Sequence, residues 1–279
     1  MFFYFRFLFI VVLIGCENPT QQSSENTSDT LSGKLIITGS STVAPLASEL
    51  AKKFEDLHKQ VKVDVQTGGS SRGIADVRRQ VSDIGMVSRK LKAAENDLTP
   101  HLLAIDGVSI IVNAKNPVLE LTAQQIRDIY LKKIVNWQSI NGVDKEITVI
   151  NKAEGRSTLE VFTKHFQLKN RDIKPDVIIG DNEQGIKLVA NNPNAIAYVS
   201  IGAAEYSVQH GVNVKALPLN GVPANTQNLA EKRFPLSREL NFVTLGEVSP
   251  LSEAFLHFSR SSQIKPIVEE YGFVALLSR

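Results

Sequence analysis

Three turns rich in glycine and hydroxyl side chains are the parts of this sequence best suited to hold an anion. They are residues 38–43, 67–73 and 155–158, and each lies between a predicted strand and a predicted helix. The first N–H groups of a helix lack partners within the helix and carry partial positive charge, so such a helix start attracts anions. Hydroxyls add uncharged donors, and Arg156 adds a charge-assisted one.

Each of these turns also has an ordinary structural explanation. Serine and threonine are common helix N-caps and glycine is common in turns, so a single such turn indicates capping alone. Three of them in one α/β chain favour a shared cleft, because ligands of open α/β sheets bind outside the carboxyl ends of the strands. None continues into the Gly-Lys-Ser/Thr of a P-loop, and residues 68–73 lack dinucleotide spacing, which argues against nucleotide chemistry.

No catalytic residue is predicted. A hydrolase or phosphotransferase built on the same turns would need a nucleophile paired with a base, and none of the five histidines lies in these turns. The five histidines show no paired metal spacing. We therefore expect a binding protein and no enzyme, with no metal site and no cofactor.

Apolar patterns predict alternating strands and helices along the chain. The expected strands are residues 34–38, 61–66, 84–88, 108–113, 147–151, 177–179, 195–200, 214–219 and 240–245. The expected helices are residues 43–57, 122–131, 159–166, 184–190 and 250–258. Alternation of this kind predicts an α/β architecture with mostly parallel sheets.

The N-terminal segment is typical of an exported lipoprotein. Residues 1–15 combine one positive charge, Arg6, with an apolar run that is shorter than the ~20 residues needed to span a bilayer. The following Cys16 is the only cysteine of the chain, and Leu-Ile-Gly-Cys resembles a lipobox, in which the cysteine is lipidated. The alternative is an ordinary signal peptide with a coincidental cysteine. Residues 17–30 are entirely polar apart from Pro19 and are expected to form a flexible tether, with the folded part beginning at Leu31.

Composition limits the possible partners. The formal net charge is +2 over 279 residues, with 43% hydrophobic residues, which suits a globular protein and argues against a nucleic-acid partner. With the lipid anchor, we expect the protein on the periplasmic or cell-surface face of a bacterial membrane.

Longer stretches around the three turns resemble the periplasmic phosphate-binding proteins of phosphate ABC transporters. The matching stretches are Gly-Ser-Ser-Thr-Val-Ala-Pro-Leu at 39–46, Gly-Ser-Ser-Arg-Gly-Ile at 69–74, Asp-Ile-Gly-Met-Val-Ser-Arg at 83–89, residues 104–113, residues 126–137 and Ala-Ile-Ala-Tyr-Val at 195–199. The resemblance covers residues 35–276. It implies a type II periplasmic-binding fold in which two α/β lobes, joined by crossover strands, close on a dehydrated anion. The implied lobes are 31–113 plus 240–279 for the first and 114–239 for the second.

The resemblance also implies the ligand, the partners and the binding residues. The protein would be a monomer that captures inorganic phosphate and hands it to the permease subunits of an ABC transporter. The implied phosphate-binding residues are Ser41, Thr42, the amide of Val43, Ser70, Ser88, Lys152, Glu154, Arg156, Ser157 and Thr158.

Two positions depart from the family pattern. Lys152 stands where the family usually has an arginine, which keeps the charge and loses the bidentate fork. Ser88 stands where the best-known members have an aspartate that accepts the proton of hydrogen phosphate and repels sulfate. Glu154, immediately before the third turn, is the candidate replacement acceptor, whereas Asp106, before a glycine, is interpreted as a turn residue. Sulfate, arsenate, molybdate or tungstate therefore remain alternative ligands, and a surface phosphate sensor or adhesin remains an alternative role.

Overall fold

The computed structural model describes residues 1–2 and 31–276. Cys16, the tether at 17–30 and all but the first two residues of the expected signal peptide lie outside the described residues. The strands that it describes are β1 Ser32–Gly39, β2 Gln60–Thr67, β3 Ile84–Val87, β4 Leu98–Asn113, β5 Thr148–Lys152, β6 Val177–Ile179, β7 Ala195–Ser200, β8 Val214–Leu217, β9 Ser237–Leu245 and β10 Val274–Ala275. The α-helices are α1 Ala44–Leu57, α2 Ser70–Arg78, α3 Ala123–Tyr130, α4 Ser157–His165, α5 Asn182–Asn191, α6 Ile201–Gln209, α7 Thr226–Ala230, α8 Pro250–Phe258 and α9 Lys265–Glu270. Over residues 31–276, none of these helices has the length and apolarity needed to cross a membrane.

Local sequence signals account for where the helices begin and which face they bury. In α1, Leu46, Leu50 and Phe54 recur at helical spacing and all three are buried. In α3, Thr122 and Gln125 form the expected capping box, in which the threonine side chain accepts from the Gln125 N–H and the Gln125 side chain accepts from the Thr122 N–H. The buried residues set the face that α1 packs into the core, and the capping box sets the first residue of α3.

The strands form a mixed sheet in the order β2-β1-β3-β9-β4-β7-β5-β6, with β8 and β10 also paired to β4. Pairing is parallel in the groups β2-β1-β3 and β7-β5-β6. Every pairing that involves β4 or β9 is antiparallel. The sheet is therefore mixed and not mostly parallel, because the long strands β9 and β4 lie between the two parallel groups and pair antiparallel with each other and with their neighbours.

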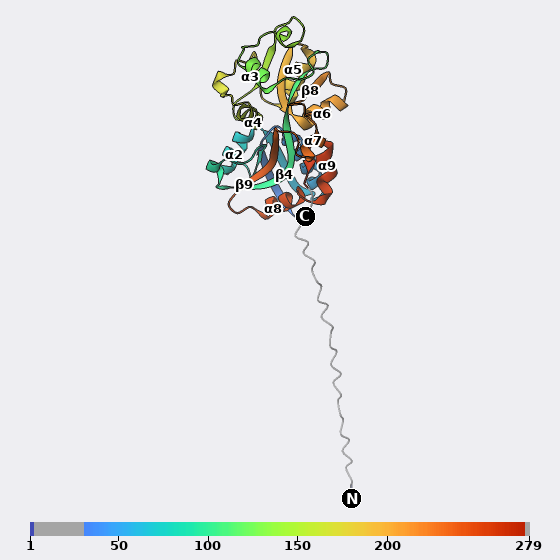
Figure 1. The fold of residues 1–279 in the computed structure, drawn as a ribbon. Coiled ribbons are helices and arrows are strands. Elements are labelled where there is room, and N and C mark those ends of the chain that lie inside the picture. The colour runs from blue at the N-terminus through green and yellow to red at the C-terminus, as the bar shows by residue number, and fades with distance from the viewer. Residues whose placement is uncertain (3–30, 277–279) are drawn as a thin grey trace. The chain divides into compact units, whose positions relative to one another are not determined.

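Strand β4 is much longer than the sequence predicted. Only residues 108–113 show a continuous apolar run, yet the strand begins at Leu98 and pairs with β9 as far as Gly107. The first part includes Pro100 and His101 and has no clean alternation, so its pairing depends on β9 rather than on its own pattern. In Figure 1, β4 and β9 lie side by side in the lower part of the fold, and β4 continues upward toward β8.

The buried hydrophobic residues form two large clusters, which define two lobes. The first lobe contains the cluster built from β1, α1, β9, α8 and α9, including Leu35, Phe54 and Phe242. The second lobe contains the cluster built from α3, α4, β5 and β7, including Tyr130, Phe162 and Tyr198. Strand β4 contributes to both, through Leu103 and Ala104 in the first and Ile110 and Val112 in the second. The two-lobed α/β fold expected from the sequence is confirmed.

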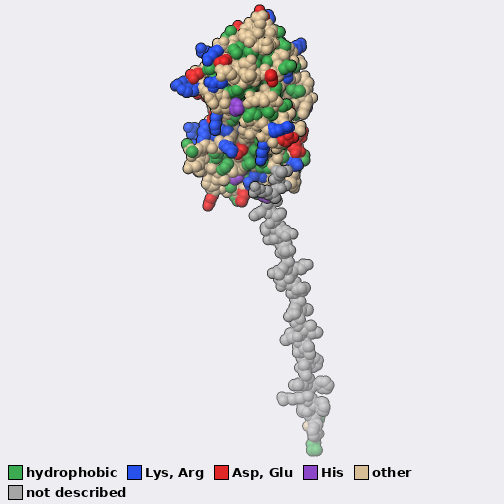
Figure 2. Space-filling view, in the orientation of Figure 1, with side chains coloured by type: hydrophobic (Ala, Val, Ile, Leu, Met, Phe, Trp, Pro, Cys, Tyr) green, Lys and Arg blue, Asp and Glu red, His purple; other side chains and the backbone are tan. Residues whose placement is uncertain are grey.

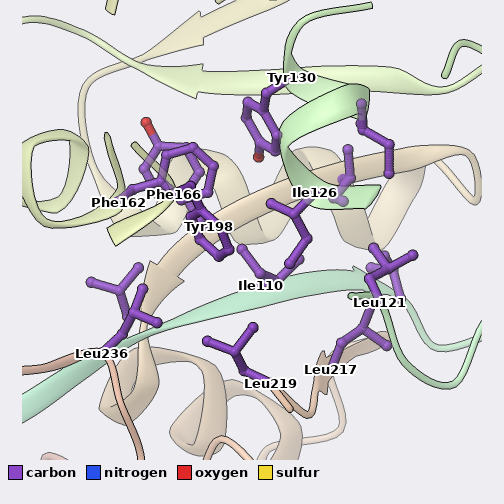
Figure 3. Packing of buried hydrophobic residues seen from close by; sticks show 14 of the residues in the cluster. Ile110, Leu121, Ile126, Tyr130, Phe162, Phe166, Tyr198, Leu217, Leu219 and Leu236 are labelled. Carbon is purple, nitrogen blue, oxygen red and sulfur yellow. The ribbon is translucent and has the colours of Figure 1, made fainter. Parts of the chain in front are cut away.

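Figure 3 shows how the second lobe packs. The ring of Tyr198 lies flat against that of Phe162, with centroids 3.9 Å apart and planes inclined by 5°. Tyr130 and Phe166 pack on the same group of rings. This aromatic stack holds α4 against β7. On the outside, positive and negative side chains are interspersed over the face seen in Figure 2, as the small net charge suggests.

Candidate functional site

The turn before α1 is organised by a serine that had not been singled out. Ser40 Oγ accepts from the Thr42 N–H at 3.2 Å and from the Val43 N–H at 3.4 Å. Ser40 Oγ also donates to Ser88 Oγ at 2.9 Å. The amide of Val43 is thus directed at Ser40, and the buried hydroxyl of Thr42 is the donor that this turn presents.

The turns before α2 and α4 touch each other. The Ser71 N–H donates to the Gly155 carbonyl at 3.2 Å. Gly69 has φ of +94°, and a Cβ added there would lie 2.6 Å from the Gly155 oxygen and 2.9 Å from Arg156 Cδ. Only glycine allows this backbone angle without strain and this approach without a clash. The approach brings Ser70, whose Oγ accepts from the Ser88 N–H at 3.2 Å, next to the start of α4.

The start of α4 holds two donors without a partner. Arg156 Nε and Ser157 Oγ are both buried, and neither makes a hydrogen bond within the part of the chain that the structure describes. Buried polar atoms are nearly always hydrogen-bonded, and leaving a donor unsatisfied costs roughly 1–3 kcal/mol. Two such donors on neighbouring residues at a helix start make this a candidate place for an acceptor from outside the chain.

A buried arginine that the sequence did not reveal joins the first and third turns. Arg238 Nη2 donates to Thr42 Oγ1 at 3.2 Å, and Nη1 donates to Thr158 Oγ1 at 2.9 Å. Arg238 is also ion-paired with Asp106, at 2.7 Å from Nη2 to Oδ2, and the two side chains are 1% and 0% exposed. Asp106 lies inside β4, so its interpretation as a turn residue was wrong; its carboxylate is there to hold Arg238.

Lys152 adds a third cation. Its Nζ donates to the Asp181 carbonyl at 2.5 Å and to Asn182 Oδ1 at 3.2 Å. Burial lowers the pKa of Lys152 to about 7, against an opposing effect of the Asp181 charge, and the charges of Arg238 and Arg156 lower it further. Three cationic side chains are therefore close enough to repel one another, and an anion among them would relieve that repulsion.

The aromatic stack of the second lobe positions Lys152. Tyr198 OH accepts from the Lys152 N–H at 3.2 Å and donates to Asn151 Oδ1. Asn182, at the start of α5, in turn donates to Thr42 Oγ1 at 3.4 Å. The end of β5 is thus tied both to its own core and to the first turn.

Most of the residues expected from the sequence lie together. Six of them are buried in this cluster: Thr42, Ser70, Ser88, Lys152, Ser157 and Thr158. Arg156 is half-buried at the same place, and Ser41 is half-buried at the start of α1. Glu154 does not join them, because it is exposed and its Oε1 accepts from Asn170 Nδ2 at 2.9 Å. It does not supply the acceptor that Ser88 lacks.

One sequence signal could have revealed Arg238. Residues Leu236, Arg238 and Leu240 alternate with more exposed ones in the run that becomes β9. An arginine in register with two core leucines must be buried with a partner, because an unpaired buried charge is very costly.

The arrangement suits a compact oxyanion. Hydroxyls and Arg156 at three helix starts meet Lys152, at the end of β5, and Arg238, in β9. The carboxylate of Asp106 in this cluster is paired with Arg238. A family model described as a PBP superfamily domain matches residues 24–263. The chain belongs to the PBP superfamily.

Several proteins that are similar to this PBP-superfamily chain have names that refer to phosphate, a compact oxyanion. A structure described as a phosphate ABC transporter substrate-binding protein with bound phosphate, from Clostridium perfringens, matches with a TM-score of 0.82 and 30% identity, over 88% of this chain and 100% of that one. An ABC-type phosphate transport receptor from Vibrio cholerae matches with a TM-score of 0.72 and 31% identity, over 87% and 100%. The phosphate-binding protein PstS of Bacillus subtilis is 27% identical over 276 residues, covering 95% of this chain and 90% of that protein. The resemblance drawn from the sequence is confirmed, and these names describe binding and transport, not catalysis.

Proposed function

We propose that this protein captures inorganic phosphate between its two lobes and delivers it to the permease subunits of an ABC transporter. The observation that carries the proposal is the pair of buried, unsatisfied donors at the start of α4, Arg156 Nε and Ser157 Oγ, beside the cations Lys152 and Arg238. A small tetrahedral anion supplies several acceptors at once to donors that converge from different directions. The names of the relatives from three bacteria support phosphate as that anion.

The proposed site lies where the lobes meet, and ligand binding would close them. We assign residues 31–113 and 240–279 to the first lobe and 114–239 to the second. The contacts of Arg238 with Thr42 and of Ser71 with Gly155 cross this boundary, whereas the contact of Arg238 with Thr158 lies within the second lobe. Rotation about β4 and β9, the strands that pass between the lobes, would separate the two pairs that cross the boundary and admit the anion.

The protein is proposed to act as a monomer held at the outer face of a bacterial membrane through lipidated Cys16. The observations behind this part are the signal-peptide pattern of residues 1–15, the lone cysteine and the polar tether. Replacing Cys16 with serine should release the protein from the membrane fraction and abolish labelling by a radioactive fatty acid. Retention of both properties would rule out lipidation at this residue.

A thermal-shift panel of phosphate, arsenate, sulfate, molybdate and tungstate tests the ligand. A ligand that binds only the folded state stabilises it, by about 2.7 kcal/mol at a concentration of 100 times its Kd. We expect a clear increase in unfolding temperature with phosphate and with its close analogue arsenate. No shift with phosphate at millimolar concentration would refute the assignment.

A second ligand class follows from the acceptors at the site. Ser88 carries a hydroxyl, which accepts from Ser40, in place of a carboxylate. The carboxylate of Asp106 is engaged by Arg238, so neither residue offers a free carboxylate to the proposed anion. A site without such an acceptor does not require a protonated ligand oxygen. Sulfate, or a larger oxyanion such as molybdate or tungstate, is therefore the alternative that the same panel decides.

A further inference from the structure

We propose that Arg238, held by Asp106, is the positioning residue of the anion site, and that it makes the hydroxyls of Thr42 and Thr158 donors to the ligand. The inference rests on the proposed phosphate site and adds to it a residue pair outside the three turns. Arg238 need not touch the anion for this role. It acts through the two threonines.

The pair is built into the two strands that pass between the lobes. Asp106 and Arg238 are directly opposite each other in the β4–β9 ladder. Arg238 donates to Asp106 Oδ2 from Nε at 3.0 Å and from Nη2 at 2.7 Å. Both side chains are almost completely buried, so the guanidinium has little freedom to reorient.

Asp106 is saturated by groups of the protein itself. Besides Arg238, Ser200 Oγ donates to its Oδ2 at 2.9 Å, and the Gly202 N–H donates to its Oδ1 at 3.4 Å. A carboxylate with these hydrogen bonds holds the arginine in one orientation. It is not placed to accept a hydrogen bond from the anion. The planar fork of Arg238 then points its remaining N–H groups in fixed directions, toward the first and third turns.

The consequence for the threonines follows from the chemistry of a hydroxyl. Each hydroxyl has one proton and two lone pairs. Thr158 Oγ1 accepts from Arg238 at 2.9 Å, and Thr42 Oγ1 accepts from Arg238 at 3.2 Å and from Asn182 at 3.4 Å. With lone pairs occupied by N–H donors, the proton of each hydroxyl is free to point at a ligand oxygen.

The guanidinium of Arg238 also fixes the positions of the Thr42 and Thr158 hydroxyls. Thr42 lies at the start of α1 in the first lobe, and Thr158 lies in the first turn of α4 in the second. Nη1 and Nη2 belong to one rigid plane, so holding one threonine with each fixes the separation of the two donors when the lobes are together. A lysine keeps the charge opposite Asp106 but cannot hold both threonines in this way.

A double-mutant cycle in the complete chain tests the proposal, with phosphate affinity measured by calorimetry. Arg238→Lys and Thr158→Val should each weaken binding about tenfold, the loss expected for one hydrogen bond to a charged ligand. Because Arg238 acts through Thr158, the double variant should lose much less than the product of the two single losses. Arg78→Lys, which alters an exposed fork on Asp97, is the matched control and should bind like the wild type.

Each result decides the inference. A double-variant loss within about threefold of the product would mean independent action and would overturn it. Thermal unfolding without phosphate checks that the variants are folded; if Arg238→Lys is not, the neutral pair Asp106→Asn with Arg238→Gln replaces it, with the same expected non-additivity. A wild-type chain that fails to bind phosphate would instead sink the proposed function, and with it the present inference. Binding by the wild type with an additive cycle would sink the inference alone.

Discussion

At the scale of single residues, two buried donors at the start of α4 link the stability of the fold to the proposed anion. Arg156 Nε and Ser157 Oγ are buried without hydrogen-bond partners among residues 31–276. Without ligand they destabilise the fold by roughly 1–3 kcal/mol each, and an anion that accepts from them recovers that free energy. If the proposed function holds, part of the binding free energy comes from satisfying these two donors.

Ser157→Ala distinguishes the effect of this donor on stability from its effect on phosphate binding, and the chain offers a matched control. Ser261 Oγ is also buried without a partner, away from α4, beside the short 3-10 helix Ser262–Ile264. Ser157→Ala should weaken phosphate binding about tenfold, whereas Ser261→Ala should leave the Kd unchanged. Both variants should unfold at the same or a higher temperature than the wild type without phosphate. Equal phosphate affinity in the two variants would contradict a ligand role for Ser157.

Lys152 should make stability depend on pH. Its pKa is about 7 in the folded protein and 10.5 by the ordinary value for lysine, chiefly because it is buried. Between these values the unfolded chain binds more protons than the folded one, so the free energy of unfolding rises as the pH increases through this window. Urea unfolding at pH 7 and pH 9 should show a larger gain for the wild type than for Lys152→Met. Parallel changes in the two proteins would show that Lys152 stays charged in the fold.

At the scale of elements, the site depends on how closely two turns approach each other. Gly69 and Gly155 both have positive φ, and the Ser71 N–H bonds the Gly155 carbonyl directly. The first turn of α2 and that of α4 are thereby brought to face one another. Helix starts can share one anion only at such short separation, because their partial charge acts within about one turn.

Gly69→Ala should disrupt that approach. Its Cβ would meet the Gly155 oxygen at 2.6 Å, so the turns must separate. Gly211→Ala is the control, because Gly211 has a similar φ of +76° and nothing within 4 Å of an added Cβ. Gly211→Ala should cost about 1–2 kcal/mol of stability through backbone strain, and Gly69→Ala should cost more because of the added clash. Only Gly69→Ala should weaken phosphate binding, by tenfold or more. Equal affinities would show that the two turns need not touch.

At the scale of the whole molecule, an ion-pair cluster joins the lobes beside the site. Arg89, just after β3, is held by Glu95 at 2.7 and 2.8 Å. Glu160 of α4 lies 3.1 Å from Arg89 Nε, without hydrogen-bond geometry, and 2.6 Å from Lys92 Nζ. Glu160 thus connects the second lobe to two cations of the first when the lobes are together.

Glu160→Gln should shift the molecule toward an open form. Partly exposed ion pairs contribute up to about 1 kcal/mol, so phosphate affinity should fall about fivefold or less. Small-angle scattering without phosphate should give a larger radius of gyration than for the wild type, and saturating phosphate should restore compaction. Glu183→Gln, an exposed change on α5, should alter neither property. An unchanged radius and affinity in Glu160→Gln would remove this cluster from the closing motion.

The sequence by itself determined the local parts of the molecule. The apolar spacing of α1, the capping box of Thr122 and Gln125, and the glycine- and hydroxyl-rich turns all involve residues a few positions apart. Their effects are decided by neighbours along the chain, so a single sequence is enough to place them. Recognition of the family motifs extended this to the two-lobed fold.

Only the tertiary structure decided how the site is held together. Arg238 is 132 residues from Asp106, 80 from Thr158 and 196 from Thr42, and no local pattern connects them. The long β4 is likewise defined by its pairing with β9, and Glu154, expected at the site, turns instead to Asn170. The contacts of Arg238 and the pairing of β4 with β9 depend on the register of strands that are far apart in the sequence. The donors could therefore be predicted from the sequence, whereas the buried ion pair that positions them could not.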